Sequence, residues 1–165
     1  MTQWHDGASY AIMEITSTAQ YPGSMLSNFA PHSFVFDGVE CASMEGFLQS
    51  LKFESEEVQV AVCQLAGVAA KRRGMPRDWK STQTLFWKGQ AIDRHSEEYQ
   101  DLLDGAYDML SQNDGFIEAL LATGDERLTH SIGRQDPQET ILTRAELCDR
   151  LMKIREELQD AAGPH

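Results

Sequence analysis

The chain has 165 residues, of which 26 are acidic and 14 basic, so its formal net charge is −12. This length fits one domain of ordinary size, and the hydrophobic fraction of 41% is sufficient for a buried core. The negative charge opposes non-specific binding to nucleic acid and to anionic membranes, which argues against those two classes of protein.

The N-terminal third predicts extended structure. Tyr10–Ile15 is rich in apolar residues and is expected to form a strand, and a turn follows at Tyr21–Ser24. The apolar runs Phe34–Phe36 and Val39–Cys41 flank Asp37-Gly38. Asp-Gly between two such runs is a strong short-range signal for a β-hairpin.

After the hairpin the pattern becomes helical. Ser43 is suited to cap a helix, and the residues that follow place apolar side chains at helical spacing: Met44, Phe47, Leu48 and Leu51. Ser55 is expected to open a second helix that runs to about Leu65, with acidic residues in its first turn. The segment Lys71–Trp79 is expected to be a basic loop, because glycine and proline interrupt it.

The C-terminal half predicts further helices. Ser96–Gln112 and Asp114–Ala122 are both expected to be helical, and Gly124 is suited to end the second. Leu128–Ser131 is expected to be a short strand. Thr143–Glu146 is a capping box that introduces a closing helix, whose apolar face carries Leu147, Leu151, Ile154 and Leu158. The expected class is α+β, a mostly helical single domain with a small β-sheet or hairpin layer.

Cysteine usage and the N-terminus indicate the compartment. Cys41, Cys63 and Cys148 are few and widely spaced, which favours reduced thiols over a disulfide framework. The N-terminus lacks the regions of a signal peptide, and no apolar run reaches the ~20 residues of a membrane helix. We therefore expect a soluble cytoplasmic domain over residues 1–165, with a core from about 8 to 158 and a frayed tail at Ala161–His165.

Three polar residues fall together on the helix that begins after Ser43. At about 100° per residue, Glu45, Gln49 and Lys52 lie within roughly 60° of one another, beside the apolar stripe. A carboxylate, an amide and an ammonium therefore line the edge of the core. The spacing alone favours a solvated face over a site, because most charged helix positions are solvated.

The histidines form no metal-binding pattern. None of the five occurs as H-x-x-x-H or H-E-x-x-H, and no cysteine–histidine group has zinc-ligand spacing, so no metal and no cofactor are expected. His130 follows the expected strand near residue 128. It is either a polar site residue or a hydrogen-bonded structural one.

A basic stretch stands out in this acidic chain. Five of the 14 basic residues gather within ten positions, namely Lys71, Arg72, Arg73, Arg77 and Lys80. Such a cluster predicts either an anion site or a solubilising loop. Trp79 lies within it and is suited to stack on a base or to pack in the core. The chain carries no nucleophile elbow, P-loop or dinucleotide-binding glycine motif.

Several segments together resemble the NADAR (YbiA-like) family. They cover about two-thirds of the chain in the order of the family's motifs: Leu26–Pro31, Ser43–Phe53, Arg77–Trp79, Ala119–Leu128, Asp136 and Leu151–Leu158. Three features depart from the family's pattern. Gly46-Phe47 stands where His-Tyr is usual, Phe86–Gln100 resembles an insertion, and Asp136–Thr143 lacks the family's glycines.

The resemblance implies a metal-independent N-glycosidase that acts on a ribosylamino-pyrimidine phosphate of riboflavin synthesis or on ADP-ribose attached to guanine. It implies catalysis by Glu45, with Asp136 as a second acid–base group. Glu45 would face the positive charge that develops at the anomeric carbon, or activate water. Lys52 would form a transient imine with the opened ribose, or hold a phosphate or hydroxyl.

The same resemblance implies a substrate-binding set. Asn28 would bind a ribose hydroxyl, and Trp79 would stack on the leaving base. The set as a whole comprises Asn28, Phe29, Gln49, Arg72, Arg73, Arg77, Trp79 and His130. The expected partner is a small ribosylated nucleotide or ADP-ribose conjugate, with nucleic acid a partner only where it is ADP-ribosylated and no membrane involved. The alternative is a module that binds ADP-ribose or a nucleotide without turnover.

Overall fold

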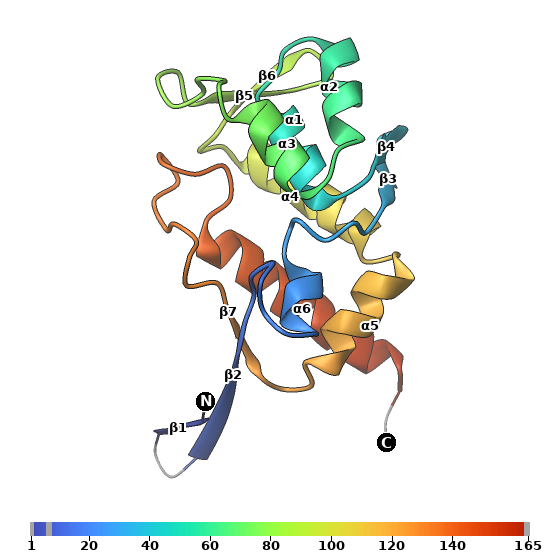
Figure 1. Ribbon diagram of the computed structural model, residues 1–165, viewed down its shortest axis with the longest axis vertical. Helices are drawn as coiled ribbons and strands as arrows, with labels where there is room; N and C mark the ends of the chain where they lie inside the picture. Colours follow the sequence, from blue (N-terminus) through green and yellow to red (C-terminus); the bar gives the residue numbers. More distant parts are fainter. Residues whose placement is uncertain (1, 6–7, 164–165) are drawn as a thin grey trace.

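The computed structural model describes residues 2–5 and 8–163 (Figure 1). The helices are η1 (Gly23–Leu26, a 3-10 helix), α1 (Met44–Ser50), α2 (Glu56–Cys63), α3 (Gly67–Gly74), α4 (Glu97–Leu110), α5 (Asp114–Ala122) and α6 (Arg144–Ala161). The strands are β1 (Thr2–His5), β2 (Ala8–Glu14), β3 (Phe34–Phe36), β4 (Val39–Cys41), β5 (Thr84–Trp87), β6 (Gln90–Asp93) and β7 (Arg127–Thr129). The expected α+β class is confirmed. Of the tail that was expected to fray, residues 164–165 lie outside the described residues.

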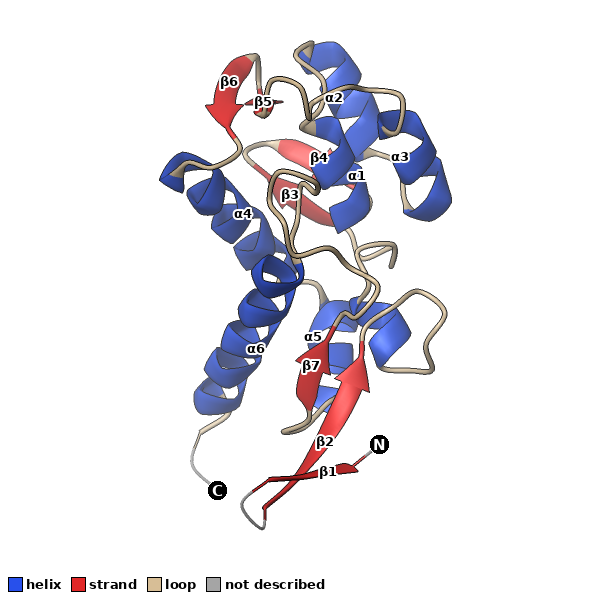
Figure 2. Cartoon of the chain, turned by 90° about the vertical axis from the view of Figure 1, so that its left-hand side faces the viewer, coloured by secondary structure: helices blue, strands red, loops and turns tan. Residues whose placement is uncertain are grey.

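One sheet joins distant parts of the chain. β2 pairs antiparallel with β1 and parallel with β7, so that Ile12 lies opposite Arg127 and Glu14 opposite Thr129. Both strands predicted near residues 10–15 and 128–131 are confirmed within a few residues. Figure 2 shows β2 and β7 side by side below α1, so the segments that leave these strands run toward α1.

The predicted β3–β4 hairpin is confirmed. Phe34 lies opposite Cys41 and Phe36 opposite Val39. Asp37 and Gly38 have φ values of 51° and 78°, the positive values that a two-residue turn of this twist requires. Trp87 from the neighbouring hairpin donates its indole N–H to Asp37 Oδ2 at 2.9 Å, which joins the two hairpins.

The helix that carries Glu45 begins as the sequence predicts. The Ser43 hydroxyl accepts a hydrogen bond from the Gly46 N–H at 2.9 Å, and the apolar stripe of α1 is buried. A Cβ atom at Gly46 would collide with the backbone carbonyl of Leu65. Glycine therefore lets the chain between α2 and α3 lie directly against α1.

The expected basic loop at Lys71–Trp79 is partly wrong. Its first residues, through Gly74, belong to α3, and the loop begins only at Met75. Ala69–Arg73 have high helix propensity, but only Ala70 and Gly74 of α3 are buried. The helix therefore has no apolar stripe that periodicity would detect.

The C-terminal helices follow their predicted caps. Asn113 caps α5, Gly124 follows it with a φ of 58°, and the Thr143–Glu146 capping box opens α6. Leu147 and Leu151 of α6 are fully buried in the core. Among the described residues no helix is both long enough and apolar enough to cross a bilayer.

Candidate functional site

A pocket of about 370 Å³ lies between α1 and α3 on one side and the segment from His130 to Leu142 on the other. Its third wall comes from Thr16 and Ser17, which follow β2, and from the Ser27–Phe29 segment. The parallel pairing of β2 with β7 brings these walls together, since Ile15 N–H donates to the Thr129 carbonyl at 2.8 Å just before both segments enter the pocket.

Glu45 is the most buried ionisable group of the pocket lining. Its side chain is 9% exposed, and Oε2 accepts a hydrogen bond of 2.8 Å from Nε2 of Gln49, one turn further along α1. Burial raises the pKa of the Glu45 carboxyl, while the Gln49 hydrogen bond and the charges of Lys52 and Lys71 act in the opposite direction. The site therefore holds a carboxyl whose proton affinity is increased.

The amide of Gln49 is fixed by what it touches. A Cβ atom at Gly74 would overlap Gln49 Oε1, so that the amide packs directly against the end of α3. Within the described chain this buried oxygen has no hydrogen-bond partner. The amide therefore points its N–H groups at Glu45 and its oxygen at α3. This orientation suits an ionised carboxylate, which only accepts hydrogen bonds.

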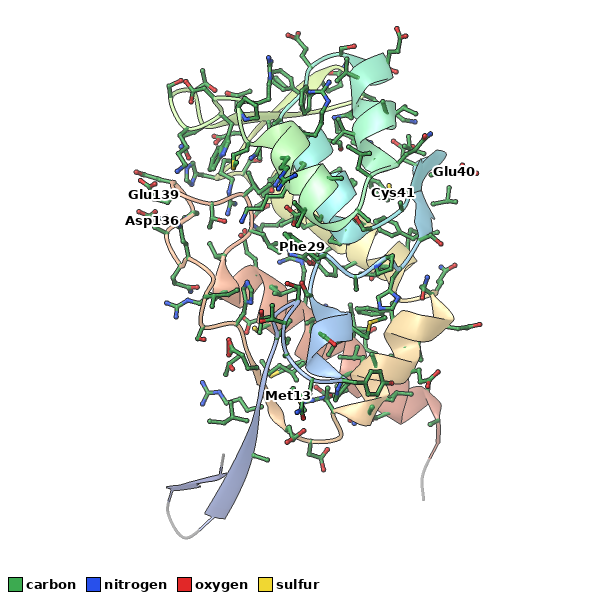
Figure 3. The ribbon with its side chains drawn as sticks, viewed as in Figure 1. Met13, Phe29, Glu40, Cys41, Asp136 and Glu139 are labelled. Atoms are coloured by element: carbon green, nitrogen blue, oxygen red, sulfur yellow. The ribbon has the colours of Figure 1, made fainter. Side chains whose placement is uncertain are left out.

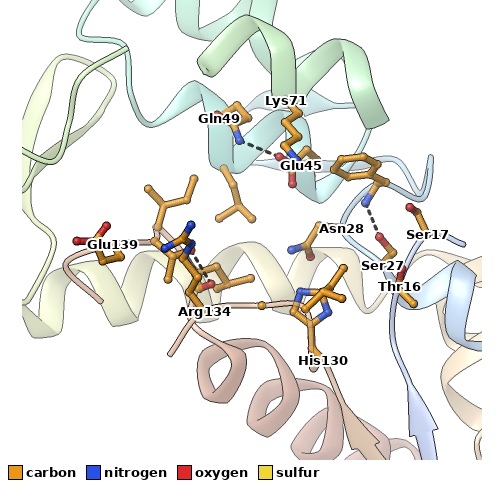
Figure 4. Close-up of a pocket in the computed structure, with 17 residues that line it drawn as sticks. Thr16, Ser17, Ser27, Asn28, Glu45, Gln49, Lys71, His130, Arg134 and Glu139 are labelled. Carbon is orange, nitrogen blue, oxygen red and sulfur yellow. Dashed lines mark hydrogen bonds between the residues drawn. The ribbon is translucent and has the colours of Figure 1, made fainter. Parts of the chain in front are cut away.

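Two lysines act on Glu45 from different positions. Lys71 of α3 lines the pocket and points toward Glu45 in Figure 4. Lys52, just after α1, is not part of the pocket lining, although its charge also acts on Glu45. Burial lowers the pKa of Lys52, which favours its neutral amine, and Glu45 opposes that shift.

The Ser27–Phe29 segment is tied to α1 and α4. The Glu45 N–H donates to the Asn28 carbonyl at 3.0 Å, and the Tyr107 hydroxyl donates to Asn28 Oδ1 at 3.0 Å. Phe29 also lines the pocket, with its N–H bonded to the Ser27 hydroxyl at 3.2 Å. The structure thus brings Asn28, Phe29, Glu45 and Gln49 to one place.

His130 lies on the wall opposite α1. Its Nδ1 is 2.6 Å from the Ile15 carbonyl, which only accepts, so Nδ1 carries a proton. In the neutral ring this leaves Nε2 as an acceptor. Gly133 packs against the same ring, because a Cβ there would overlap His130 Cδ2.

The remaining wall comes from the segment between β7 and α6. Asp136 and Glu139 both lie on this segment (Figure 3). Arg134 and Glu139 line the pocket, whereas Asp136 does not; its carboxylate accepts from the Gln138 N–H at 2.9 Å. Glu139 forms an ion pair of 3.2 Å with Lys80, which connects this wall to the segment after α3.

A buried ion pair supports this wall from behind. Arg94, only 1% exposed, binds both carboxylate oxygens of Glu146 at 3.1 and 2.7 Å and donates to the Thr140 carbonyl at 3.0 Å. The Tyr99 hydroxyl donates to the Ile141 carbonyl at 2.5 Å. These bonds fix the backbone of Thr140 and Ile141, two residues of the pocket lining.

The predicted arginines and Trp79 lie elsewhere. Arg73 and Arg77 place their guanidinium groups over the Phe53 ring, at 4.7 and 5.2 Å from its centroid, and line a separate hollow. Arg72 is exposed on α3, outside the lining of the pocket. Trp79 is 5% exposed and belongs to the core, so its indole does not reach the pocket surface.

Sequence reasoning missed three charged residues of the lining as site residues. Lys71 was noted only as part of the basic stretch, and Arg134 and Glu139 lie in a segment without periodicity. The one available signal was their position between a predicted strand and a predicted capping box, where a connecting loop often carries binding residues. In the part of the chain that the structure describes, no three His, Cys, Asp or Glu side chains gather as a metal site would require.

Comparisons with known proteins agree with this architecture. The family model described as bacteriophage protein GP30.3 matches residues 20–156. An uncharacterized 17.1 kDa protein from the Gp30-rIII intergenic region of Enterobacteria phage T4 is 39% identical over 151 residues, covering 88% of this chain and 98% of that protein. The NMR structure of the E. coli protein YbiA matches with a TM-score of 0.60 at 21% identity, over 94% of this chain and 89% of that one. The YbiA-like fold expected from the sequence is thereby confirmed.

Proposed function

This chain belongs to the bacteriophage protein GP30.3 family, and on that premise we propose that it is an N-glycosidase that hydrolyses the bond between ribose and base in a ribosylated nucleotide. The observation that carries the proposal is the buried Glu45 carboxylate, held by Gln49 in a pocket of about 370 Å³. A pocket of this size is within the range that small ligands occupy. The substrate class is a ribosylamino-pyrimidine phosphate or an ADP-ribosyl-guanine conjugate.

Glu45 acts on the anomeric carbon in this proposal. As the C1′–N bond breaks, its electron pair leaves with the base and positive charge develops on the ribose, which a carboxylate stabilises in a site with little water. Water then adds its oxygen to C1′ and releases one proton, and the departing nitrogen takes up one proton. Arginine and lysine at the pocket, Arg134 and Lys71, bind the anionic part of the substrate.

We assign the second acid–base role to Glu139 instead of Asp136. Glu139 lines the pocket, whereas Asp136 lies outside it and accepts a backbone hydrogen bond of its own segment. Asn28 and His130 offer hydrogen bonds to ribose, and Phe29 offers an apolar surface to the base. The transient imine stays with Lys52, whose amine has a lowered pKa; because Lys52 lies outside the pocket lining, this role requires the opened ribose to extend beyond the pocket.

The direct test is release of free base from ADP-ribosylated guanosine and from a ribosylamino-pyrimidine phosphate, followed by chromatography. We expect cleavage of one of the two by the wild-type protein without added metal, and none by Glu45→Gln. Tight binding of ADP-ribose with no cleavage of either compound would contradict the enzyme and support the alternative, a binding module without turnover.

A further inference from the structure

Asn28 is held at both its backbone and its side chain. Its carbonyl accepts the Glu45 N–H from the first turn of α1, and its Oδ1 accepts the hydroxyl of Tyr107 from α4, both at 3.0 Å. These two bonds come from two different helices, α1 and α4. The backbone bond therefore fixes the position of Asn28, and the side-chain bond fixes which end of its amide faces the pocket.

Tyr107 is placed to determine that orientation. It is 1% exposed, its ring belongs to the core, and burial raises the pKa of its hydroxyl, so the hydroxyl keeps its proton. Among the described residues Asn28 Oδ1 is the acceptor for that proton. Turning the amide over would leave the buried hydroxyl proton without an acceptor, which is unfavourable. The amide nitrogen is thus directed toward the pocket interior, as Figure 4 shows.

We propose that Tyr107 is a positioning residue, which locks the Asn28 carboxamide as a hydrogen-bond donor beside Glu45. The ligand atom that contacts Asn28 must then be an acceptor, such as the oxygen of a ribose hydroxyl, rather than an N–H group. The identity of the ligand rests on the proposed function, but the locked orientation does not. It follows from two hydrogen bonds and from the burial of one hydroxyl.

The orientation is testable without any substrate. The side-chain amide of Asn28 gives a ¹⁵N-bound pair of proton signals, which is assigned by its loss in Asn28→Ala. We expect a high order parameter for this side-chain amide in the wild type and a clearly lower one in Tyr107→Phe. Tyr99→Phe is the matched control, because it removes a buried hydroxyl from the same helix that bonds to Ile141 instead. An amide that stays equally rigid in Tyr107→Phe would overturn the proposal.

The functional consequence is tested by a double-mutant cycle on base release. Tyr107→Phe is expected to lower kcat/KM by roughly 3–10-fold, the scale of one neutral hydrogen bond, and to have less than about a 2-fold effect when Asn28 is already alanine. Tyr99→Phe should instead have the same effect in both backgrounds. Equal effects of Tyr107→Phe with and without the Asn28 side chain would assign Tyr107 a purely structural role.

The two experiments separate this inference from the proposed function. If the wild-type protein cleaves neither compound, the N-glycosidase proposal fails, while the amide relaxation still decides whether Tyr107 orients Asn28. The cycle is then measured on the affinity for ADP-ribose by calorimetry. Coupling between the two variants in that affinity is the expected result, and additive effects would count against the inference.

Discussion

Gln49 donates its side-chain N–H to the Glu45 carboxylate at 2.8 Å, and the same amide leaves its own oxygen unpaired against Gly74, within the described chain. This orientation of the Gln49 amide gives the carboxylate a hydrogen bond and leaves the amide oxygen without one. An unpaired buried acceptor is unfavourable, so this orientation of the Gln49 amide has a cost. Burial has the larger effect on the pKa of Glu45 and raises it, while the bond to Gln49 lowers it.

Glu45→Gln is expected to keep the fold and reduce base release by at least ~10²-fold, the scale for losing one electrostatic contributor to a transition state. The amide preserves the shape of the side chain while removing its charge. Turnover by chromatography and far-UV circular dichroism measure the two properties. Glu40→Gln, on the exposed face of β4, is the matched control. Near-normal turnover in Glu45→Gln would return Glu45 to a structural role.

The raised pKa of Glu45 predicts a stability difference that depends on pH. Because the pKa in the folded protein lies above the ordinary value of 4.5, folding favours the protonated carboxyl. The stability that this group contributes is fully present below pH 4.5 and is lost as the pH rises through the pKa of Glu45 in the folded protein. Glu45→Gln should therefore melt at a higher Tm than the wild type at pH 7, and the difference should shrink toward pH 4.5. Tm values of both proteins across this range measure it.

Other carboxyls that lose stability in acid, such as Glu146 with its lowered pKa, affect both proteins equally and cancel in the difference. A wild-type protein with a higher Tm than Glu45→Gln at pH 7 would contradict this prediction. In the activity profile, a catalytic Glu45 carboxylate predicts turnover that rises with pH through the same raised pKa, whereas a Glu45 acid predicts the opposite slope.

Gly74→Ala is expected to lower both stability and turnover. Alanine usually stabilises a helix position relative to glycine, but here its methyl group would overlap Gln49 Oε1. We expect a loss of about 1–3 kcal/mol in the free energy of unfolding, as for other overpacked sites. In a Gln49→Ala background the same change should cost much less, which denaturation of the four proteins measures. An undiminished loss in that background would show that Gln49 is not the colliding group.

Much of this fold follows from local rules. The Asp37-Gly38 turn, the Ser43 cap and the Thr143–Glu146 capping box each specify their element through residues within a few positions, and each has the predicted form. Glu45 and Gln49 face the same place for the same reason, since residues four apart lie on one side of a helix.

The parts that sequence missed depend on distant contacts. The pocket exists because β2 pairs with β7, more than 100 residues away along the chain, and no local pattern encodes that pairing. Arg134 and Glu139 enter the lining from an aperiodic segment that Arg94 supports through Thr140. Trp79 lies within a basic stretch yet packs in the core, because the segment after α3 turns back onto the protein.

An imine mechanism predicts a covalent adduct on Lys52. The lowered pKa of its amine increases the neutral, nucleophilic fraction, and borohydride would reduce an imine formed with the opened ribose to a stable secondary amine. Peptide mass spectrometry after turnover with borohydride should find this adduct on Lys52. The amount of adduct on Lys71, which lines the pocket, is the internal comparison for that on Lys52. No adduct, together with an active Lys52→Arg, would leave Lys52 an electrostatic role.

Two sets of cations are candidates for binding the phosphate of the substrate. Arg134 and Lys71 line the pocket from opposite walls, whereas Arg73 and Arg77 stack over Phe53 outside it. In an acidic protein, a bound phosphate requires cations within hydrogen-bond reach, since the surrounding field repels it. The pocket set is therefore expected to bind the phosphate.

Arg134→Ala should raise KM for a phosphorylated substrate at least ~10-fold more than for its dephosphorylated nucleoside, because a charged hydrogen bond contributes about 1.5–3 kcal/mol. Turnover at saturation should change less, since a remote phosphate contributes mainly uniform binding. Arg73→Ala is the matched control and should affect both compounds equally. Added salt should weaken the wild-type preference, because exposed charges are screened over about 8–10 Å. A preference lost in Arg73→Ala and kept in Arg134→Ala would move the phosphate site to the hollow around Phe53.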